Sequence, residues 1–148
     1  MEKSFIDFDV FVPEGLPRIR CRPEQLEQVL MNLIINAIHS LDERYPAAAA
    51  DKKLRIHVEN ATVNHCKHLV MVVEDRGCGM SESTRQRIFD PFFTTKGRDK
   101  GTGLGLSVSD GIVKDHGGFF EVVSEPNTFT RFKVFLPVDG PVKSSTRR

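Results

Sequence analysis

Hydrophobic and polar side chains alternate along the chain in ways that predict β-strands. Residues 5–12 and 54–61 alternate apolar with polar or charged positions, whereas 69–73 is a continuous apolar run typical of a strand buried on both faces. Residues 119–124 and 129–136 flank a Glu125-Pro126-Asn127 turn, which predicts a closing hairpin. Residues 18–21 predict a further short strand.

Two longer segments follow the helical period. Residues 23–41 begin with Pro23, which suits a first helical position, and with Glu24, where the helix dipole favours an acidic side chain. Residues 104–116 end at Gly117 and Gly118, a common stop signal. Helical propensity returns at 83–88, and 45–53 is expected to be a loop. Helices packed on one face of a mixed, mostly antiparallel sheet give an α/β two-layer sandwich.

Composition fits a single domain without a broad electrostatic field. The 148 residues are 39% hydrophobic, enough for one core, and we expect a domain over residues 1–137 with a flexible tail over 138–148. The formal net charge is +1, so nothing points to nucleic acid or membrane, and an anion site must be local. We expect the isolated domain to be monomeric.

The cysteines and the first residues of the chain indicate in which cellular compartment the protein is located. Cys21, Cys66 and Cys78 are odd in number and lack metal-ligand spacing, which disfavours a disulfide framework or a zinc site and favours a reducing compartment. Residues 1–10 lack the basic start and apolar run of a signal peptide, and no segment approaches membrane-span length. These features predict a cytoplasmic domain, whether or not a full-length protein is attached to a membrane.

Polar side chains gather on one side of the first long helix. At 3.6 residues per turn, five of them project within about 80° of one another: Gln25, Gln28, Asn32, Asn36 and His39. The helix is otherwise apolar almost all round, so we expect it to be buried, with its two asparagines bonded inside the protein or lining a cavity. A solvated stripe on an amphipathic helix fits this segment equally well.

The apolar strand at 69–73 delivers an acidic pair, Glu74 and Asp75, to a turn that contains Gly77 and Gly79. A carboxylate there can accept a hydrogen bond from an exocyclic amine, and glycines let a flat ring approach the backbone. Taken alone, the pattern fits a plain Asp-Gly turn better.

A phenylalanine-rich segment follows at residues 88–96. Phe89, Phe92 and Phe93 surround a proline and are expected to anchor a loop by burying area, and Lys96 starts a basic stretch. Taken alone, an ordinary hydrophobic corner beside a solvated basic loop is the better interpretation.

The second long helix opens on a glycine-rich sequence at residues 101–105. Free N–H groups and the positive end of the helix dipole bind phosphate, and glycines let its oxygens come close. The spacing matches neither the dinucleotide fingerprint nor the Walker loop, so this segment alone is a weak signal.

The order of these four features changes the interpretation. It runs Asn-x-x-x-Asn on a helix, Asp-x-Gly-x-Gly after a strand, Phe-x-Pro-Phe, then Gly-x-Gly-x-Gly at a helix start. This order resembles the N, G1, F and G2 boxes of the histidine-kinase ATPase domain, in the GHKL superfamily with gyrase, the heat-shock chaperone ATPases and the mismatch-repair ATPases. The resemblance covers residues 5–137 and implies the Bergerat fold.

The resemblance implies roles for the first two boxes. Asn36 would bind Mg²⁺ through its amide oxygen, with Asn32 near the triphosphate of ATP. Asp75 would accept from the adenine amino group, while Gly77 and Gly79 would shape the adenine pocket.

The other two boxes would form the phosphate site and its lid. Phe89 and Phe93 would be the hinge of the lid, and Lys96 would reach the phosphates from it. The phosphates would be cradled by the G2 residues: Gly101, Thr102, Gly103, Leu104 and Gly105. The segment from Phe93 to Gly103 is expected to be mobile until nucleotide binds.

Asn32 also bears on the reaction. In the hydrolysing branches of the superfamily this position is a glutamate that activates water as a general base, and an amide cannot do so. Transfer to a protein side chain is therefore favoured over hydrolysis. The acceptor histidine of the kinase branch precedes an acidic residue, and none of the five histidines here does.

We therefore expect the ATP-binding catalytic domain of a sensor histidine kinase. It would transfer the γ-phosphoryl group of Mg-ATP to a histidine on a separate dimerisation domain, and act indirectly on a response regulator. Two alternatives stay open: a non-catalytic nucleotide-binding regulator with the same pocket, and a serine kinase of the anti-sigma type.

Overall fold

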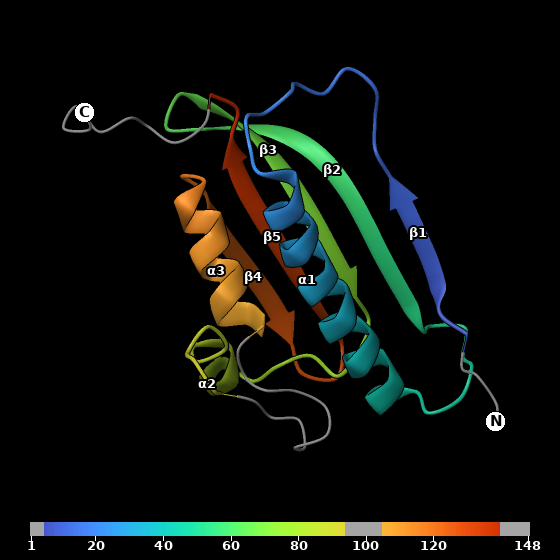
Figure 1. Cartoon of the computed structure of the whole chain (residues 1–148). Coiled ribbons are helices and arrows are strands. Elements are labelled where there is room, and N and C mark those ends of the chain that lie inside the picture. The colour runs from blue at the N-terminus through green and yellow to red at the C-terminus, as the bar shows by residue number, and fades with distance from the viewer. Residues whose placement is uncertain (1–4, 94–104, 140–148) are drawn as a thin grey trace.

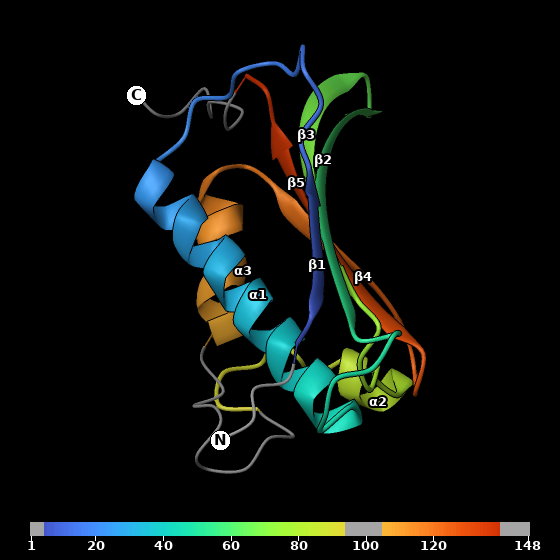
Figure 2. The ribbon, with the colours of Figure 1, turned by 90° about the vertical axis from the view of Figure 1, so that its right-hand side faces the viewer.

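The structure is a computed structural model that describes residues 5–93 and 105–139. Its elements run in the order β1 (Asp7–Phe11), α1 (Pro23–Arg44), β2 (Lys53–Val63), β3 (Cys66–Asp75), α2 (Glu82–Arg85), α3 (Gly105–Asp115), β4 (Phe119–Glu125) and β5 (Phe129–Pro137). The strands form one sheet in the order β1-β2-β3-β5-β4 (Figure 1). Figure 2 shows both long helices on the same side of this sheet, which confirms the predicted two-layer α/β sandwich.

The sheet is mixed but mostly antiparallel, as predicted. β1 pairs with β2 in parallel, and α1 supplies the crossover that a parallel pair requires. The other three pairings are antiparallel. β3 therefore lies at the centre, and its last residue, Asp75, lies between Leu54 of β2 and Thr130 of β5.

Helix α1 is buried on one side only. Its buried stripe recurs every fourth residue and packs on the sheet: Val29, Leu33, Ala37 and Leu41. The prediction that this helix is buried all round is wrong, because the side chains of Met31 and Ile35 are 52% and 42% exposed. In a two-layer fold the sheet and α3 cover two sides of α1, so apolar residues on the outer side stay in water.

Helix α3 ends where its glycines predict. Gly117 has a positive φ of 79°, and the N–H groups of Gly117 and Gly118 donate to the carbonyl oxygens of Lys114 and Val113 at 2.9 Å each. This is the Schellman arrangement, in which a residue in the left-handed region lets the chain reverse. It turns the chain from α3 directly into β4.

Strand β3 is buried on both faces, as its apolar run predicts. Val73 belongs to the core under the helices. Val70 and Val72 point to the other face of the sheet, where they pack with Phe135 and with partly buried Ala61 in a second cluster. Side chains of the neighbouring strands thus shield the central strand where no helix covers it.

Several element bounds differ from those predicted. Residues 18–21 form no strand, and α1 continues to Arg44 instead of ending at residue 41. Strands β2 and β3 extend past the predicted ends because they form a long hairpin, in which backbone pairing continues through polar positions to Val63 and Cys66. The helix predicted at 83–88 is a single turn, α2, capped by the Ser81 hydroxyl.

The connection between α1 and β2 contains a buried charge. The Lys52 side chain is fully buried, with its Nζ 2.8 Å from Oδ1 of Asp42, and it donates to the carbonyl oxygen of Tyr45 at 2.8 Å. Removing an ion from water costs several kcal/mol unless partners compensate. The ion pair therefore ties this connection to the end of α1.

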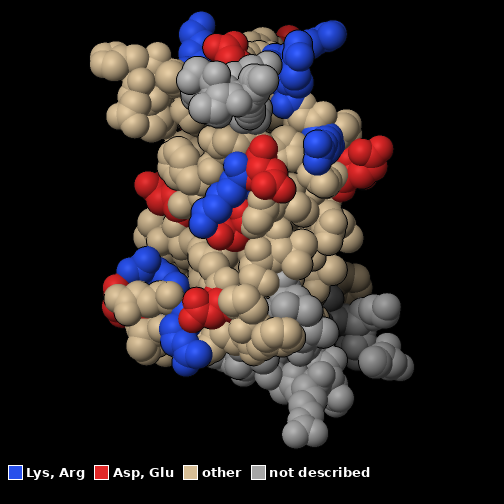
Figure 3. Space-filling view, turned by 60° about the vertical axis from the view of Figure 1, so that its left-hand side comes forward, with Lys and Arg blue, Asp and Glu red and all other residues tan. Residues whose placement is uncertain are grey.

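Charges of both signs are interspersed over the face shown in Figure 3, in keeping with the small net charge. Of the helices that the structure describes, none is both long and apolar enough to cross a membrane.

Candidate functional site

A ridge of polar side chains runs along α1 and organises the site. Its members are spaced four residues apart, so they lie on one side of the helix: Asn32, Asn36, Ser40 and Arg44. The first member contacts α3, and the last two contact the loop that follows β3. The predicted N box therefore lies between the start of α3 and the G1 loop.

Asn32 is bonded inside the protein and is not part of a solvated stripe. Its Nδ2 donates to the carbonyl oxygen of Gly105 at 3.0 Å and to the hydroxyl of Ser109 at 2.9 Å. Gly105 is the first residue of α3 and the last glycine of the predicted G2 box. The structure thus brings together the N box and the G2 box, which are 73 residues apart in sequence.

Asp75 closes the turn after β3. Asp75 is only 4% exposed, and its Oδ1 accepts a hydrogen bond from the Gly77 N–H at 2.8 Å. The Asp-Gly turn that the sequence also predicts is therefore present. Acceptance of a bond from adenine by this carboxylate stays a prediction.

Two side chains at the end of α1, Ser40 and Arg44, hold the backbone of the G1 loop by hydrogen bonds. The Ser40 hydroxyl accepts from the Cys78 N–H at 2.8 Å. Arg44 Nη1 donates to the carbonyl oxygens of Arg76 and Gly77 at 3.2 and 3.1 Å. The same nitrogen donates to a third carbonyl oxygen, in the turn between β4 and β5, at 3.2 Å. One arginine therefore joins α1, the G1 loop and that turn.

Both glycines of the G1 loop are required by packing inside the protein. A Cβ added to Gly77 would overlap the Ser40 hydroxyl, and one added to Gly79 would overlap the carbonyl oxygen of Glu125. Gly79 also has a φ of 68°, which L side chains rarely adopt. Gly105 differs, because a Cβ there would meet the Asn32 side chain at 3.7 Å, an ordinary contact.

Cys78, between these two glycines, is a poor nucleophile in its surroundings. Burial raises the pKa of its thiol, and the nearby carboxylate of Glu43 raises it further, although Arg44 opposes the shift. The thiol is therefore neutral near pH 7.

The phenylalanine-rich segment anchors itself with two rings and not with three. The Phe89 ring packs against Phe120 of β4 with centroids 5.0 Å apart, and the guanidinium of Arg87 lies 4.5 Å from the Phe93 centroid. The prediction that Phe92 is also an anchor is wrong: it is 74% exposed and has a φ of 68°. The turn after Pro91 directs its side chain into solvent.

Some predicted site residues lie outside the described residues. They are Lys96, Gly101, Thr102, Gly103 and Leu104, together with most of the predicted lid. Their roles stay predictions.

Three residues of the site were not predicted from the sequence: Ser40, Arg44 and Ser109. The first two had a signal, because continuing the four-residue spacing of Asn32 and Asn36 leads directly to them. Ser109 had none, since a single serine in a helix does not reveal a partner 77 residues away.

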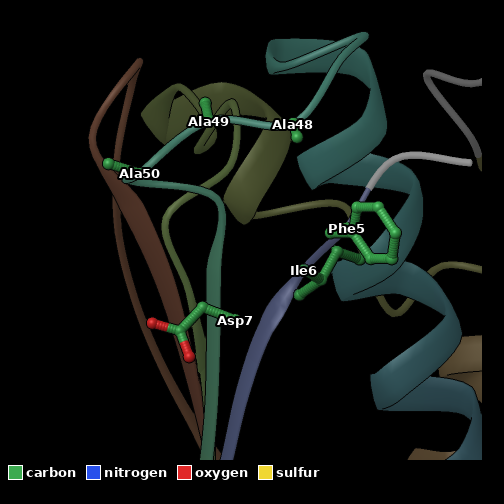
Figure 4. Close-up of a pocket in the computed structure, with 6 residues that line it drawn as sticks. All are labelled: Phe5, Ile6, Asp7, Ala48, Ala49 and Ala50. Atoms are coloured by element: carbon green, nitrogen blue, oxygen red, sulfur yellow. The ribbon is translucent and has the colours of Figure 1, made fainter.

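A separate depression of about 480 Å³ lies between the start of β1 and the connection from α1 to β2. Figure 4 shows the Asp7 side chain on the other side of the strand from Phe5 and Ile6. Three consecutive alanines, at positions 48–50, also line the depression. Its lining contains no residue of the N, G1, F or G2 boxes.

Two helices on one face of a mixed sheet, with Asn32 of α1 bound to the start of α3 and Ser40 and Arg44 bound to a glycine loop, fit an ATPase domain of the histidine-kinase type. The family model described as "Histidine kinase-, DNA gyrase B-, and HSP90-like ATPase" matches residues 21–140, and the chain belongs to this family.

Two proteins that are similar to this chain in sequence are sensor kinases. The chain is 42% identical to sensor kinase CckA of Brucella abortus in an alignment over 122 residues that covers 76% of the chain and 12% of CckA. It is 38% identical to sensor histidine kinase ZraS of Klebsiella oxytoca in an alignment over 131 residues that covers 87% of the chain and 25% of ZraS. The chain thus spans a quarter or less of the length of these relatives.

A solved structure gives the same result. The nucleotide-free catalytic domain of histidine kinase ThkA superposes with a TM-score of 0.69 at 31% identity, covering 90% of this chain and 80% of that one. The fold is therefore that of a histidine-kinase catalytic domain, as the sequence predicts.

Proposed function

We propose that this chain binds Mg-ATP and transfers its γ-phosphoryl group to a histidine on a separate dimerisation domain. The observation that carries the proposal is the polar ridge of α1. One rigid helix holds Asn32 against the start of α3, and Ser40 and Arg44 against the loop after Asp75. This arrangement supports a site whose phosphate and adenine ends would have fixed positions relative to each other.

The residues of the site fit adenine and phosphate. Asp75 would accept from the adenine amino group beside the G1 loop. The first turn of α3, beginning at Gly105, would offer free N–H groups and the positive end of a helix dipole to the phosphates. Lys96 and residues 101–104 would complete the phosphate cradle, with Phe89 and Phe93 as the hinge of the lid.

The residues also fit magnesium. Mg²⁺ takes few protein oxygens and shares its octahedral shell with waters and substrate phosphates. The amide oxygen of Asn36 would be its protein ligand, between the two fixed ends of the ridge. Within residues 5–93 and 105–139, no group of three or more His, Cys, Asp or Glu side chains could form an all-protein metal cage. When bound, the ion would neutralise charge on the phosphates.

Asn32 favours transfer over hydrolysis. Its amide nitrogen is held by two acceptors on α3, and an amide does not take up a proton near pH 7. Water near the γ-phosphate therefore has no general base at this position. Phosphoryl transfer needs positioning and charge neutralisation, which the ridge, a bound ion and α3 would supply.

The acceptor would be the dimerisation domain of a longer sensor kinase, located in the cytoplasm and acting indirectly on a response regulator. The relatives support this proposal, since each is a sensor kinase several times longer than the matched segment.

Incubation with γ-labelled ATP tests the proposal. We expect this chain alone to remain unlabelled, because no histidine precedes an acidic residue, and to label a separately supplied dimerisation domain from its own kinase. The label should be lost in acid, as a phosphoramidate is. Acid-stable label would instead indicate a serine kinase. Rapid phosphate release without acceptor would indicate an ATPase, and nucleotide binding without any transfer would indicate a regulator.

Replacing Asn36 tests the magnesium ligand. Asn36→Ala is expected to weaken ATP binding about tenfold in Mg²⁺ and to leave binding in EDTA unchanged, because it removes a metal ligand and no nucleotide contact. Titration calorimetry under both conditions gives the comparison. Asn60→Ala, on an exposed position of β2, is the matched control. An equal loss with and without Mg²⁺ would place the ion elsewhere.

A further inference from the structure

We propose that Ser109 is a positioning residue for phosphoryl transfer, acting through the carboxamide of Asn32. The inference rests on the proposed function and adds a residue to it. Ser109 lies in α3, four residues after Gly105, and is fully buried. Its Oγ lies 2.9 Å from Nδ2 of Asn32.

The contact with Gly105 determines which way the Asn32 amide points. The backbone carbonyl of Gly105 can only accept a hydrogen bond, so the Asn32 atom 3.0 Å from it must be the NH₂ group. The second N–H of that group then donates to the Ser109 hydroxyl. Both hydrogens of the amide are therefore directed at acceptors on α3, and the amide oxygen takes part in neither bond.

Ser109 gives the second N–H of the carboxamide its partner in this orientation. A 180° flip of the carboxamide would bring its oxygen against the carbonyl oxygen of Gly105, two acceptors facing each other. Without the Ser109 hydroxyl, one amide N–H would lose its partner at a part-buried position, and the side chain could rotate to satisfy it elsewhere. The serine therefore removes freedom that the Gly105 contact alone leaves.

The same contact sets the spacing between the N box and the start of α3. At the opposite end of α3, His116 accepts from the Arg22 N–H at its Nε2, at 3.1 Å, and its Nδ1 donates to the Ile112 carbonyl oxygen at 2.8 Å. Helix α3 is thus tied to α1 near both of its ends. Of these two ties, the one through Asn32 and Ser109 contains residues of the proposed nucleotide site.

A role in packing alone is the alternative. Buried small residues also allow helices to approach, and Ser109→Ala would preserve that fit while removing the hydroxyl. A packing role predicts normal nucleotide binding by this variant. A positioning role predicts weaker binding that depends on the presence of Asn32.

A double-mutant cycle measured by calorimetry separates the two roles. Ser109→Ala is expected to weaken Mg-ATP binding about tenfold, and to cause no further loss in an Asn32→Ala background. Ser109→Thr, which keeps a hydroxyl, should restore most of the affinity. The control Gly111→Ala lies on the same helix, where an added Cβ meets nothing within 4 Å, and should bind as the parent does. Parental affinity of Ser109→Ala, or losses that add in the double variant, would overturn the proposal.

The side-chain amide of Asn32 gives a readout that is independent of nucleotide. In ¹H–¹⁵N spectra of the parent, we expect both Asn32 amide protons at hydrogen-bonded shifts, and Ser109→Ala should displace one more than the other. Two solvent-like amide protons in the parent would overturn the proposal even if a variant failed to fold. A parent that shows the bonded amide but binds no Mg-ATP would instead refute the proposed function.

Discussion

Asp75→Asn is expected to weaken ATP binding about 100-fold or more while leaving the fold intact. Oδ1 of Asp75 accepts from the Gly77 N–H, and the oxygen of asparagine can keep that bond and the turn. The other carboxylate oxygen becomes an NH₂ group. If Asp75 binds adenine as proposed, a donor would then face the donor amine of the base, and a repulsive contact would replace the hydrogen bond.

Inosine triphosphate provides the sharpest comparison for this variant. Its base carries a carbonyl where adenine carries the amine, and an NH₂ group in the protein can donate to it. The parent should therefore prefer ATP, and Asp75→Asn should lose that preference when both nucleotides are titrated. Glu74→Gln is the matched control, since Glu74 lies on the other face of β3 and pairs with Arg131 at 3.0 Å. An equal loss for both nucleotides would indicate a distorted loop instead of a lost adenine contact.

The elements most fully predicted from the sequence are those whose period continues over many residues. The helix predicted from residue 23 is present as α1, and the paired glycines end α3 as expected. Ends of elements were less predictable, because the β2–β3 hairpin is continued by backbone pairing that any side chain permits. Local composition could not reveal how far that pairing extends.

Side-chain environment was the least predictable property. The hydrophobicity of Met31 and Ile35 predicted that both are buried. Both are exposed, because the fold has only two layers and the outer side of α1 faces water. Phe92 is as apolar as Phe89, yet the backbone turn after Pro91 exposes one ring while the other packs on Phe120. Such outcomes depend on contacts between segments far apart in sequence.

The site itself was predicted as a set of motifs and not as a set of contacts. The spacing of Asn32 and Asn36 placed both on one helix face, but gave no indication that Asn32 binds Gly105 and Ser109. Gly77 and Gly79 were assigned to a ligand pocket, whereas the structure shows that neighbouring protein atoms already require them. A motif glycine can therefore serve the fold, the ligand or both, and substitution has to separate these roles.

Gly79→Ala is expected to lower the free energy of unfolding by about 3 kcal/mol or more, and the melting temperature by about 10 °C. The new Cβ would overlap the carbonyl oxygen of Glu125 at a residue whose φ of 68° already disfavours an L side chain. The loop and the β4–β5 turn would have to separate, which threatens the bond from the Asn127 N–H to the Cys78 carbonyl oxygen and that from the Met80 N–H to the Ser124 hydroxyl.

Gly105→Ala is the matched comparison for Gly79→Ala, because a Cβ has room at Gly105 and none at Gly79. Its Cβ would make an ordinary contact with Asn32 at 3.7 Å. The free energy of unfolding of this variant, measured in urea, should therefore lie within about 0.5 kcal/mol of that of the parent. If Gly105 cradles phosphate, the same variant should bind ATP more weakly although it is stably folded, because a methyl group would occupy space that the phosphate oxygens need. Parental stability of Gly79→Ala would show that the G1 loop can move away from β4. A stability loss in Gly105→Ala as large as that in Gly79→Ala would show that the start of α3 is packed more tightly than the 3.7 Å contact indicates.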